Sequence, residues 1–537
     1  MAVSEIVKAH GQRASGTVGF VGQVGGSSTV AGRFALTPLA LALAGIGFAH
    51  AAPPAPNQLP SGGKIVAGSA SISQSAAQTG AIMNISQSSQ RAAIDWQSFN
   101  VGSQAQINFL QPTASSATLN RVLDSNPSQI FGRINAPGQV FFVNPNGIYF
   151  GPSASVDVGA LVATTHSISN DDFMAGNLVF SRNGATGSIV NDGELKAALG
   201  GYIALLAPEV RNQGVIVAQL GTVVLAAGET YELQFDGNNT LANIRVTPAT
   251  IRALVENGNA VHAPGGLIIL SAQAASRLQG GVINNSGTLE ATSLTNNGGV
   301  IRLSASDSIN HSGSITADAA PGSAGNGGTI SLIADLSNPN SQTFVSGSIS
   351  ARGGDLGGNG GFVETSAARL TIADQARVTT AATMGLAGTW LLDPADFTIG
   401  PTASGTITAG TPSGDISGAT LGTALGSGNV TILSTQGSAS GSGNVNVNDA
   451  VTWAANKLTL NAQNNININA NLNGSGAASL ALQFGQGAVA ASNTSNYFLN
   501  NGAQVTLPAG NNFSTLLGSD GATTKVDPEV KTESCRV

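Results

Sequence analysis

Two short phrases alternate along residues 187–367, and they constrain the fold of this chain more than any other feature of its sequence. Both place apolar residues at every second position, which predicts strands with one buried face. The first phrase, Asn-x-Gly-x-(Leu/Ile)-x-Ala, occurs at 191–197, 212–218 and 285–291, and without its Asn at 311–317 and 345–351. The second, Gly-Gly-x-(Ile/Val)-x-Leu-x-Ala, occurs at 200–207, 265–272, 298–305 and 327–334, with variants at 220–227 and at 360–367, where Thr365 replaces Leu.

A short strand with one apolar face cannot bury that face alone, whereas stacked copies can. With about 20 residues per coil and about 4.8 Å between stacked strands, the repeats predict an all-β fold, a right-handed parallel β-helix (solenoid) with a β-rich N-terminal cap. The glycines are expected at coil corners, which need positive φ or close backbone approach. A β-propeller would need more even spacing and four strands per unit.

One insert interrupts the repeats near residues 229–264. Residues 231–235 are predicted to be extended. Residues 248–256, which start with Pro248, are a helix candidate with Thr247 as its N-cap.

The composition supports stacked strands and excludes several functions. Only 9% of the residues are charged, against about a quarter in typical domains, and Ser, Thr, Asn and Gln supply the polarity instead. Such side chains form ladders along stacked strands. The net charge is −7, and the sequence shows no basic patch of the kind that nucleic acid requires. Cys535 is the single cysteine, so no intrachain disulfide would obstruct passage through a membrane.

The N-terminus reads as an export signal. Lys8, Arg13 and Arg33 precede a short apolar stretch at 35–49, and Ala49-His50-Ala51 is a small-x-small cleavage sequence. We therefore predict a signal peptide with an extended n-region at 1–51, cleaved between Ala51 and Ala52, and a secreted or surface protein that passes through the periplasm.

No constellation of catalytic or metal-binding residues is found in the sequence. The histidines share no metal-site spacing, and the glycine-rich stretches 322–328 and 353–361 lack the Gly-Lys-Ser/Thr ending of a phosphate loop and the tandem Asp of calcium repeats. We predict coil corners there, and neither a cofactor nor a metal.

The phrase Asn144-Pro145-Asn146-Gly147-Ile148 joins two apolar alternating runs. Pro145 favours the second position of a turn, and Asn146-Gly147 tolerate left-handed backbone, so the phrase predicts a strand, a tight turn and a strand.

Residues 60–172 resemble the N-terminal secretion domain of filamentous haemagglutinin-like exoproteins, the exported partners of bacterial two-partner secretion. The phrases that carry this resemblance lie at 94–102, 107–109, 119–122, 126–132 and 138–151, and those at 388–394 and 396–399 also resemble the family. A second motif of some relatives, Asn-Pro-Asn-Leu, is absent upstream of the first, and relatives are usually far longer.

The resemblance implies that Asn144, Pro145, Asn146, Gly147 and Ile148 form the secretion motif, either by recognition or by keeping the domain foldable. Supporting residues are Trp96, Phe99, Asn120, Arg121, Asn126 and Pro127. We expect Trp96 and Phe99 in the core or cap, and Arg121 as an anchor that bonds carbonyls near a turn rather than as a transporter contact.

The resemblance also implies a function and a partner. An outer-membrane β-barrel transporter of a Gram-negative bacterium, with periplasmic receptor domains, would export the chain as a non-enzymatic haemagglutinin-like adhesin. The host-cell or bacterial surface receptor is not identified by the sequence. The alternatives are the carrier portion of a contact-dependent toxin truncated before its toxin domain, and a β-helix enzyme acting on polysaccharide.

The expected organisation is therefore a signal peptide (1–51), a secretion domain (52–172), β-helix repeats (173–400), further Gly/Ser/Thr/Asn-rich coils (401–520) and a disordered tail (521–537).

Overall fold

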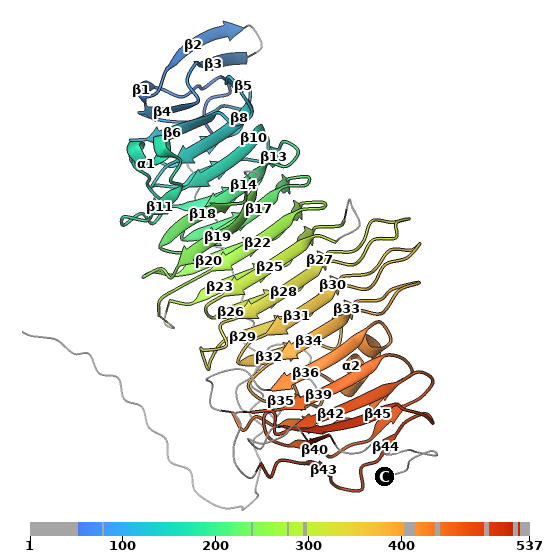
Figure 1. Ribbon diagram of the computed structural model, residues 1–537. Coiled ribbons are helices and arrows are strands. Elements are labelled where there is room, and N and C mark those ends of the chain that lie inside the picture. Colours follow the sequence, from blue (N-terminus) through green and yellow to red (C-terminus); the bar gives the residue numbers. More distant parts are fainter. Residues whose placement is uncertain are drawn as a thin grey trace, which may run out of the picture. The chain divides into compact units, whose positions relative to one another are not determined.

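The computed structural model describes residues 52–77, 80–237, 240–276, 279–293, 298–401, 414–434, 441–487, 493–518 and 525–526. The predicted signal peptide, Cys535 and the tail beyond β46 (Lys525–Val526) lie outside these residues, as does Ala51 of the cleavage site. In the described part, strands of successive coils pair in parallel, which confirms the parallel β-helix (Figure 1).

Each regular coil contributes one strand to each of three faces. Along the first face lie β14 (Tyr202–Leu206), β17 (Thr222–Ala227), β22 (Leu267–Ala272), β25 (Val300–Ala305), β28 (Thr329–Ala334), β31 (Phe362–Ser366), β34 (Thr389–Asp393), β36 (Asn429–Ser434), β39 (Lys457–Ala462), β42 (Ser479–Phe484) and β45 (Phe513–Leu517), which β46 meets antiparallel. Along the second lie β13 (Glu194–Ala197), β16 (Val215–Val217), β21 (Ala260–His262), β24 (Thr288–Glu290), β27 (Ser314–Thr316), β30 (Ser348–Ser350) and β33 (Arg377–Thr379), and later β38 (Val451–Trp453), β41 (Leu472–Gly474) and β44 (Val505–Thr506).

The third face begins in the first coils. Its strands are β7 (Ser128–Ile130), β9 (Ile148–Phe150), β12 (Ser188–Asn191), β15 (Glu209–Asn212), β20 (Ala253–Asn257), β23 (Gly281–Asn285), β26 (Ser308–His311), β29 (Gln342–Val345) and β32 (Arg369–Ile372), followed by β35 (Phe397–Ile399), β37 (Val445–Val447), β40 (Ile466–Ile468) and β43 (Tyr497–Leu499). A short helix, α2 (Gly418–Leu425), contacts β33 and β38 and stands where a strand of the second face would lie.

The N-terminal cap mixes parallel and antiparallel pairs. Its strands are β1 (Lys64–Ala67), β2 (Ala70–Ala77), β3 (Gly80–Gln87), β4 (Arg91–Trp96), β5 (Ala105–Leu110), β6 (Ala117–Val122), β8 (Arg133–Val143) and β10 (Ser155–Thr164). β1 pairs antiparallel with β4 and β2 with β3, whereas β8 pairs in parallel with β5, β6 and β10. The cap therefore starts the parallel stack on which later coils are laid.

The core follows from the alternation seen in the sequence. In β25, Ile301, Leu303 and Ala305 are buried and their neighbours are not. Registered pairing places like residues above one another, as in the column Ile268, Ile301, Ile330 and Val363. Where Thr365 replaces Leu, its hydroxyl accepts a hydrogen bond from Trp390 Nε1 at 3.1 Å, so the substitution leaves no unpaired polar group.

A buried ladder explains the Asn of the first phrase. Each amide Nδ2 donates to the Oδ1 of the next coil, from Asn191 to Asn212, Asn257 and Asn285 in turn, at 2.8 Å each. Asn285 Nδ2 then meets His311 Nδ1 at 3.1 Å, and His311 Nε2 lies 3.1 Å from Ser348 O. Because a carbonyl only accepts, His311 must carry its proton on Nε2 and accept on Nδ1. The ladder ends there because Val345 follows in register.

The glycines of the same phrase are required by close stacking. A Cβ on Gly214 would lie 2.1 Å from Gly193 O, and one on Gly313 would lie 2.1 Å from Gly287 O. The expected close approach of backbones is therefore the reason for glycine at these corners.

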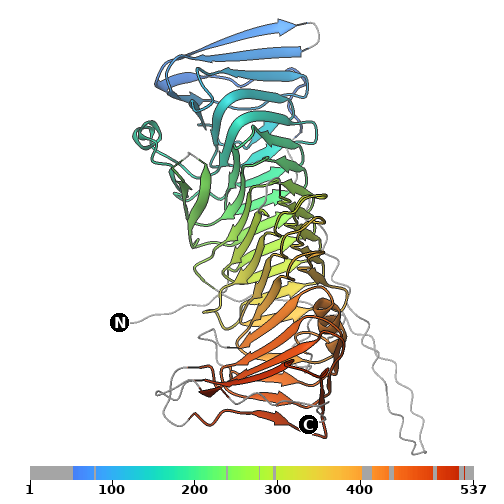
Figure 2. The same ribbon diagram turned by 45° about the vertical axis from the view of Figure 1, so that its right-hand side comes forward.

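A side unit packs outside the coils. Helix α1 (Asn170–Ala175) and the antiparallel sheet β11 (Val179–Ser181), β18 (Thr230–Phe235) and β19 (Leu241–Thr247) cover a second apolar cluster that includes Phe141, Phe173 and Tyr231 (Figures 1 and 2). The extended stretch predicted at 231–235 is β18. The helix predicted at 248–256 is wrong: Thr247 ends β19, and Ala253–Asn257 form β20 because Asn257 joins the buried ladder.

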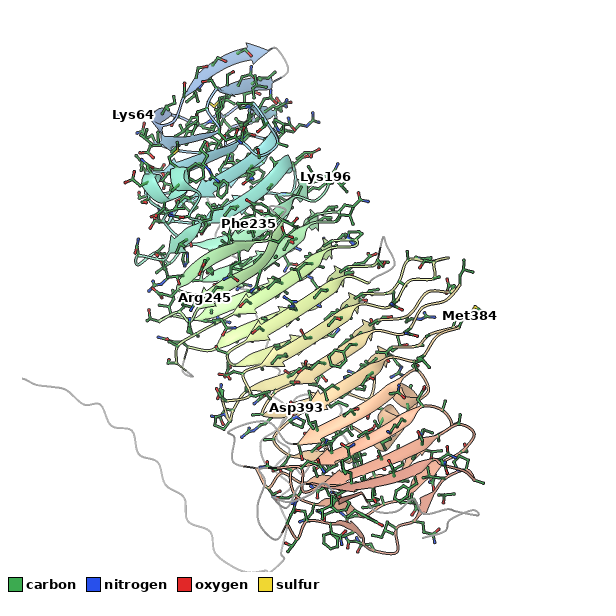
Figure 3. All side chains as sticks on the ribbon, viewed as in Figure 1. Lys64, Lys196, Phe235, Arg245, Met384 and Asp393 are labelled. Carbon is green, nitrogen blue, oxygen red and sulfur yellow. The ribbon has the colours of Figure 1, made fainter. Side chains whose placement is uncertain are left out.

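Both glycine-rich stretches lie in corner loops between the second and first faces, as predicted. Loops 317–328, 351–361 and 380–388 stack on one another through backbone bonds such as Gly354 N to Gly325 O (2.9 Å) and Gly360 N to Leu386 O (2.9 Å). Figure 3 shows Met384 at the projecting end of the last loop. Neither described helix is long and apolar enough to cross a bilayer.

We expect acidification to destabilise the fold through His311. Burial lowers its pKa, whereas the unfolded side chain takes up a proton near pH 6.5. The unfolded state then binds more protons below about pH 6.5, so the free energy of unfolding falls as the pH falls. His311→Asn keeps an acceptor for Asn285 and should flatten this dependence. Urea unfolding midpoints at pH 7.5 and 5.0 test this. If the midpoint falls by the same amount between these pH values in the variant and the native protein, the expectation is contradicted.

Candidate secretion site in the first coils

The turn between β8 and β9 is closed by its own first asparagine. Gly147 N donates to Asn144 O at 3.0 Å, and Asn146 N donates to Asn144 Oδ1 at 3.0 Å. Gly147 has φ +118°, a left-handed value that favours glycine. The predicted strand–turn–strand at 144–148 is therefore present, and the Asn144 side chain holds it.

Asn144 also ties this turn to the coil before it. Its Nδ2 donates to Asn126 O at 2.9 Å and to Ser128 Oγ at 3.0 Å, and the whole residue is buried. Ser128 N donates to Gly147 O at 3.0 Å. The two similar phrases, Asn126-Pro127-Ser128 and Asn144-Pro145-Asn146, thus lie in consecutive coils and are joined by hydrogen bonds.

The following coil packs against the other side of the turn. Gly187 N donates to Pro145 O at 3.2 Å, and a Cβ on Gly147 would lie 2.9 Å from Ser188 O. Ile148 is buried and pairs with both Ser128 and Ile189. The motif is therefore one layer of the stack, and its backbone is enclosed by the layers on both sides.

Only part of the motif reaches the surface. Pro145 and Asn146 are exposed, and Asn146 Nδ2 donates to Asp124 O at 2.9 Å. Asn126 and Pro127 of the preceding turn are exposed too, and Leu123 just before it is 64% exposed. These five residues form what we call the turn surface: Leu123, Asn126, Pro127, Pro145 and Asn146. Leu123 was not singled out in the sequence, because one apolar residue before a turn carries no signal.

Trp96 and Phe99 lie in the core beneath this region. Their rings meet edge to face with centroids 5.3 Å apart, and Phe99 contacts Phe142 at 4.9 Å. Trp96 Nε1 donates to Asn120 Oδ1 at 3.0 Å, and Asn120 Nδ2 donates to Phe141 O at 3.3 Å. Both aromatic residues and Asn120 are buried, so none of the three presents a surface to a partner.

Arg121 connects the cap to helix α1. Its guanidinium lies 3.6 Å from Asp95 Oδ1 and donates to Asn170 Oδ1 at the start of the helix. It acts as an anchor, as expected, but its partners are side chains and not the carbonyls that the sequence suggested. Ala52, the expected first mature residue, is exposed.

The described histidines make polar contacts within the fold. His166 Nε2 lies 3.1 Å from Gly228 O, and burial lowers its pKa to about 4. His262 Nδ1 lies 2.9 Å from Glu290 Oε2. Among the described residues there is no group of three or more His, Cys, Asp or Glu that would hold a metal ion.

Residues 58–317 match the family model of the TPS secretion domain. These residues, just under half of the chain, therefore carry the secretion domain of two-partner secretion exoproteins, which Gram-negative bacteria pass through the periplasm and across the outer membrane.

Two relatives are Heme/hemopexin-binding proteins of Haemophilus influenzae. One, from strain Rd, is 32% identical over 257 residues, which are 46% of this chain and 27% of that protein. The other is 27% identical over 280 residues, 48% of this chain and 29% of that protein. The matches thus span less than a third of either relative. The HMW1 secretion domain of H. influenzae aligns with a TM-score of 0.48 and 22% identity, over 83% of this chain and 98% of its own.

Replacing the clasp should destabilise the first coils. Asn144→Ala removes the donor to Asn126 O and Ser128 Oγ and the acceptor of Asn146 N, and leaves buried polar groups unpaired. We expect the free energy of unfolding to fall by about 1–3 kcal/mol. Asn126→Ala, which shortens an exposed asparagine and keeps the carbonyl that accepts from Asn144, is the matched control. Urea unfolding of refolded full-length proteins measures both, and equal midpoints would rule out a structural role for the clasp.

Proposed function

We propose that the first coils act both as the export signal and as the folding nucleus of a secreted adhesin. An outer-membrane transporter would capture the domain in the periplasm through periplasmic receptor domains, by strand addition between an extended segment and a sheet edge. The observation that supports this proposal best is the turn surface, which is exposed while Asn144 and Ile148 of the motif are locked into the stack.

Folding outside the cell would then favour export. Each completed coil buries its apolar face, which is worth roughly 25 cal/mol for each Å² removed from water. A coil that has folded onto the one before it cannot slide back through a transporter without losing that free energy. The buried ladder adds a further bond at each of its coils, because each new amide satisfies the donor of the last.

The later coils, within 173–400 and 401–520, would carry the contact function of the fibre. We propose a non-enzymatic, adhesive role for them, on either a host cell or a bacterial surface. Their long repetitive flanks present hydroxyl and amide groups, which suit binding better than proton transfer.

The first test is secretion with and without the outer-membrane transporter encoded nearest to this gene. The medium and the periplasm are both probed for the mature chain. Appearance in the medium only with the transporter supports the proposal, whereas periplasmic retention in both strains contradicts it.

Exposed and buried positions of the motif should affect export differently. Leu123→Ser and Asn146→Ala change the turn surface and should lower the secreted amount several-fold while the melting temperature changes by less than about 2 °C. Asn144→Ala should lower both. If the turn-surface variants are secreted like the native chain, the motif acts through folding alone and is not recognised.

A further inference from the structure

The last described coils carry a regular array of asparagines on the third face. Three sequence segments contribute alternate residues to it: 444–448 around β37, 465–469 around β40 and 496–500 around β43. Parallel pairing places Asn446 beside Asn467 and Asn467 beside Phe498. The nine outward positions form three columns of three, and only Phe498 is not asparagine: Asn444, Asn465, Asn496; Asn446, Asn467, Phe498; Asn448, Asn469, Asn500. We call these nine residues the asparagine array.

Hydrogen bonds along each column fix the amides. Asn467 Nδ2 donates to Asn446 Oδ1 at 2.9 Å. Asn469 Nδ2 donates to Asn448 Oδ1 at 2.7 Å, and Asn500 Nδ2 donates to Asn469 Oδ1 at 2.9 Å. In the remaining column the amide oxygens of Asn444 and Asn465 accept from the backbone N–H of the next coil, at 3.0 and 2.9 Å.

These bonds use half of the hydrogen-bonding capacity of the Asn469 side chain and less of that of Asn467. An asparagine side chain has two N–H donors and two acceptor lone pairs. Asn469 gives one N–H to Asn448 and one lone pair to Asn500, which leaves one of each. Because alternate residues along a parallel strand are about 6.6 Å apart and neighbours across strands about 4.8 Å, the remaining groups repeat at regular spacings in both directions.

The array is uncharged and partly exposed. None of its nine residues ionises, and Asp396 in the preceding layer is occupied by Ser442 N (3.0 Å), Ser442 Oγ (3.0 Å) and Asn444 N (3.1 Å). The nine residues of the array therefore offer an acidic or a basic ligand no opposite charge. A ligand that gains from this surface must be neutral and rich in groups that both donate and accept.

Phe498 gives the array an apolar element. Phe498 is 43% exposed, whereas its neighbour Tyr497 points inward, with its ring centroid 5.7 Å from that of Phe484. An exposed ring in line with two amides, Asn446 and Asn467, offers a flat apolar surface next to hydrogen-bonding groups. Sugar rings present this combination, with an apolar C–H face and hydroxyls at the rim.

We propose that the asparagine array binds a neutral polysaccharide, with a sugar ring stacked on Phe498 and hydroxyls of neighbouring units bonded to the amides. The inference rests on the adhesive role proposed above and names its class of partner. The array lies beyond residues 58–317, so glycan binding and export are separable.

Affinity electrophoresis of the purified mature chain tests the proposal. The gels contain a neutral polysaccharide (dextran, galactomannan or xyloglucan) or an acidic one (heparin or polygalacturonate). Retardation is expected in at least one neutral gel and in neither acidic gel. Phe498→Ala and Asn467→Ala should weaken the binding at least tenfold.

Two control variants match the changes in kind. Phe362→Ala removes another exposed phenylalanine, on the first face, and Asn108→Ala breaks an amide column of the cap, in which Asn108 bonds Asn84 and Asn135. Both should bind like the native chain. Since Asn467→Ala also breaks a column bond, Phe498→Ala, with an unchanged melting temperature, is the decisive variant.

Three results would overturn the proposal. One is the absence of retardation by all three neutral polysaccharides. Another is binding that Phe498→Ala leaves unchanged. The third is a dimer in sedimentation that Phe498→Ala dissociates, which would show that a second copy of the chain covers the array. Because these measurements use purified protein and do not depend on secretion, a failure here leaves the export proposal untouched, and a failure of export leaves this proposal untouched.

Discussion

Register between stacked coils is the constraint on which the rest of this structure depends. A slip of one residue in any strand would turn its buried side chains outward, because strand side chains alternate. The column from Ile268 to Val363 exists only because the coils pair without a slip. The buried ladder enforces the same register in another way, since an amide moved by one position would lose its partner in the core.

The proposed secretion motif, Asn144–Ile148, is one layer of this stack. Asn144 bonds back to Asn126 and Ser128, and Pro145 O receives Gly187 N from the coil that follows. The same five residues thus contribute a buried clasp and an exposed tip. A requirement for folding and a requirement for recognition are therefore compatible in one turn, because they fall on different atoms.

Sequence reasoning succeeded where a pattern is local and failed where partners are distant. Alternation predicted the strands and Asn144–Ile148 predicted the turn, because both depend on neighbours in the chain. The helix expected at 248–256 was wrong because local propensity is overridden by the coil, which needs Asn257 in its ladder. For Arg121, the sequence predicted an anchor, yet its partners Asp95 and Asn170 lie in a strand and a helix whose packing no local rule predicts.

By itself the sequence determined that this chain stacks short strands, that its corners need glycine and that its front end belongs to an export system. Only the tertiary structure decided which side chains meet. Asn446 and Asn467 are 21 residues apart, whereas Asn469 and Asn500 are 31 apart, yet both pairs are adjacent-coil neighbours. Because the loops between strands differ in length, the paired asparagines are not separated by a constant number of residues. A search for a fixed sequence repeat therefore does not find these columns. Burial of the apolar residues between the asparagines sets the register across coils, and the array on the surface is its consequence.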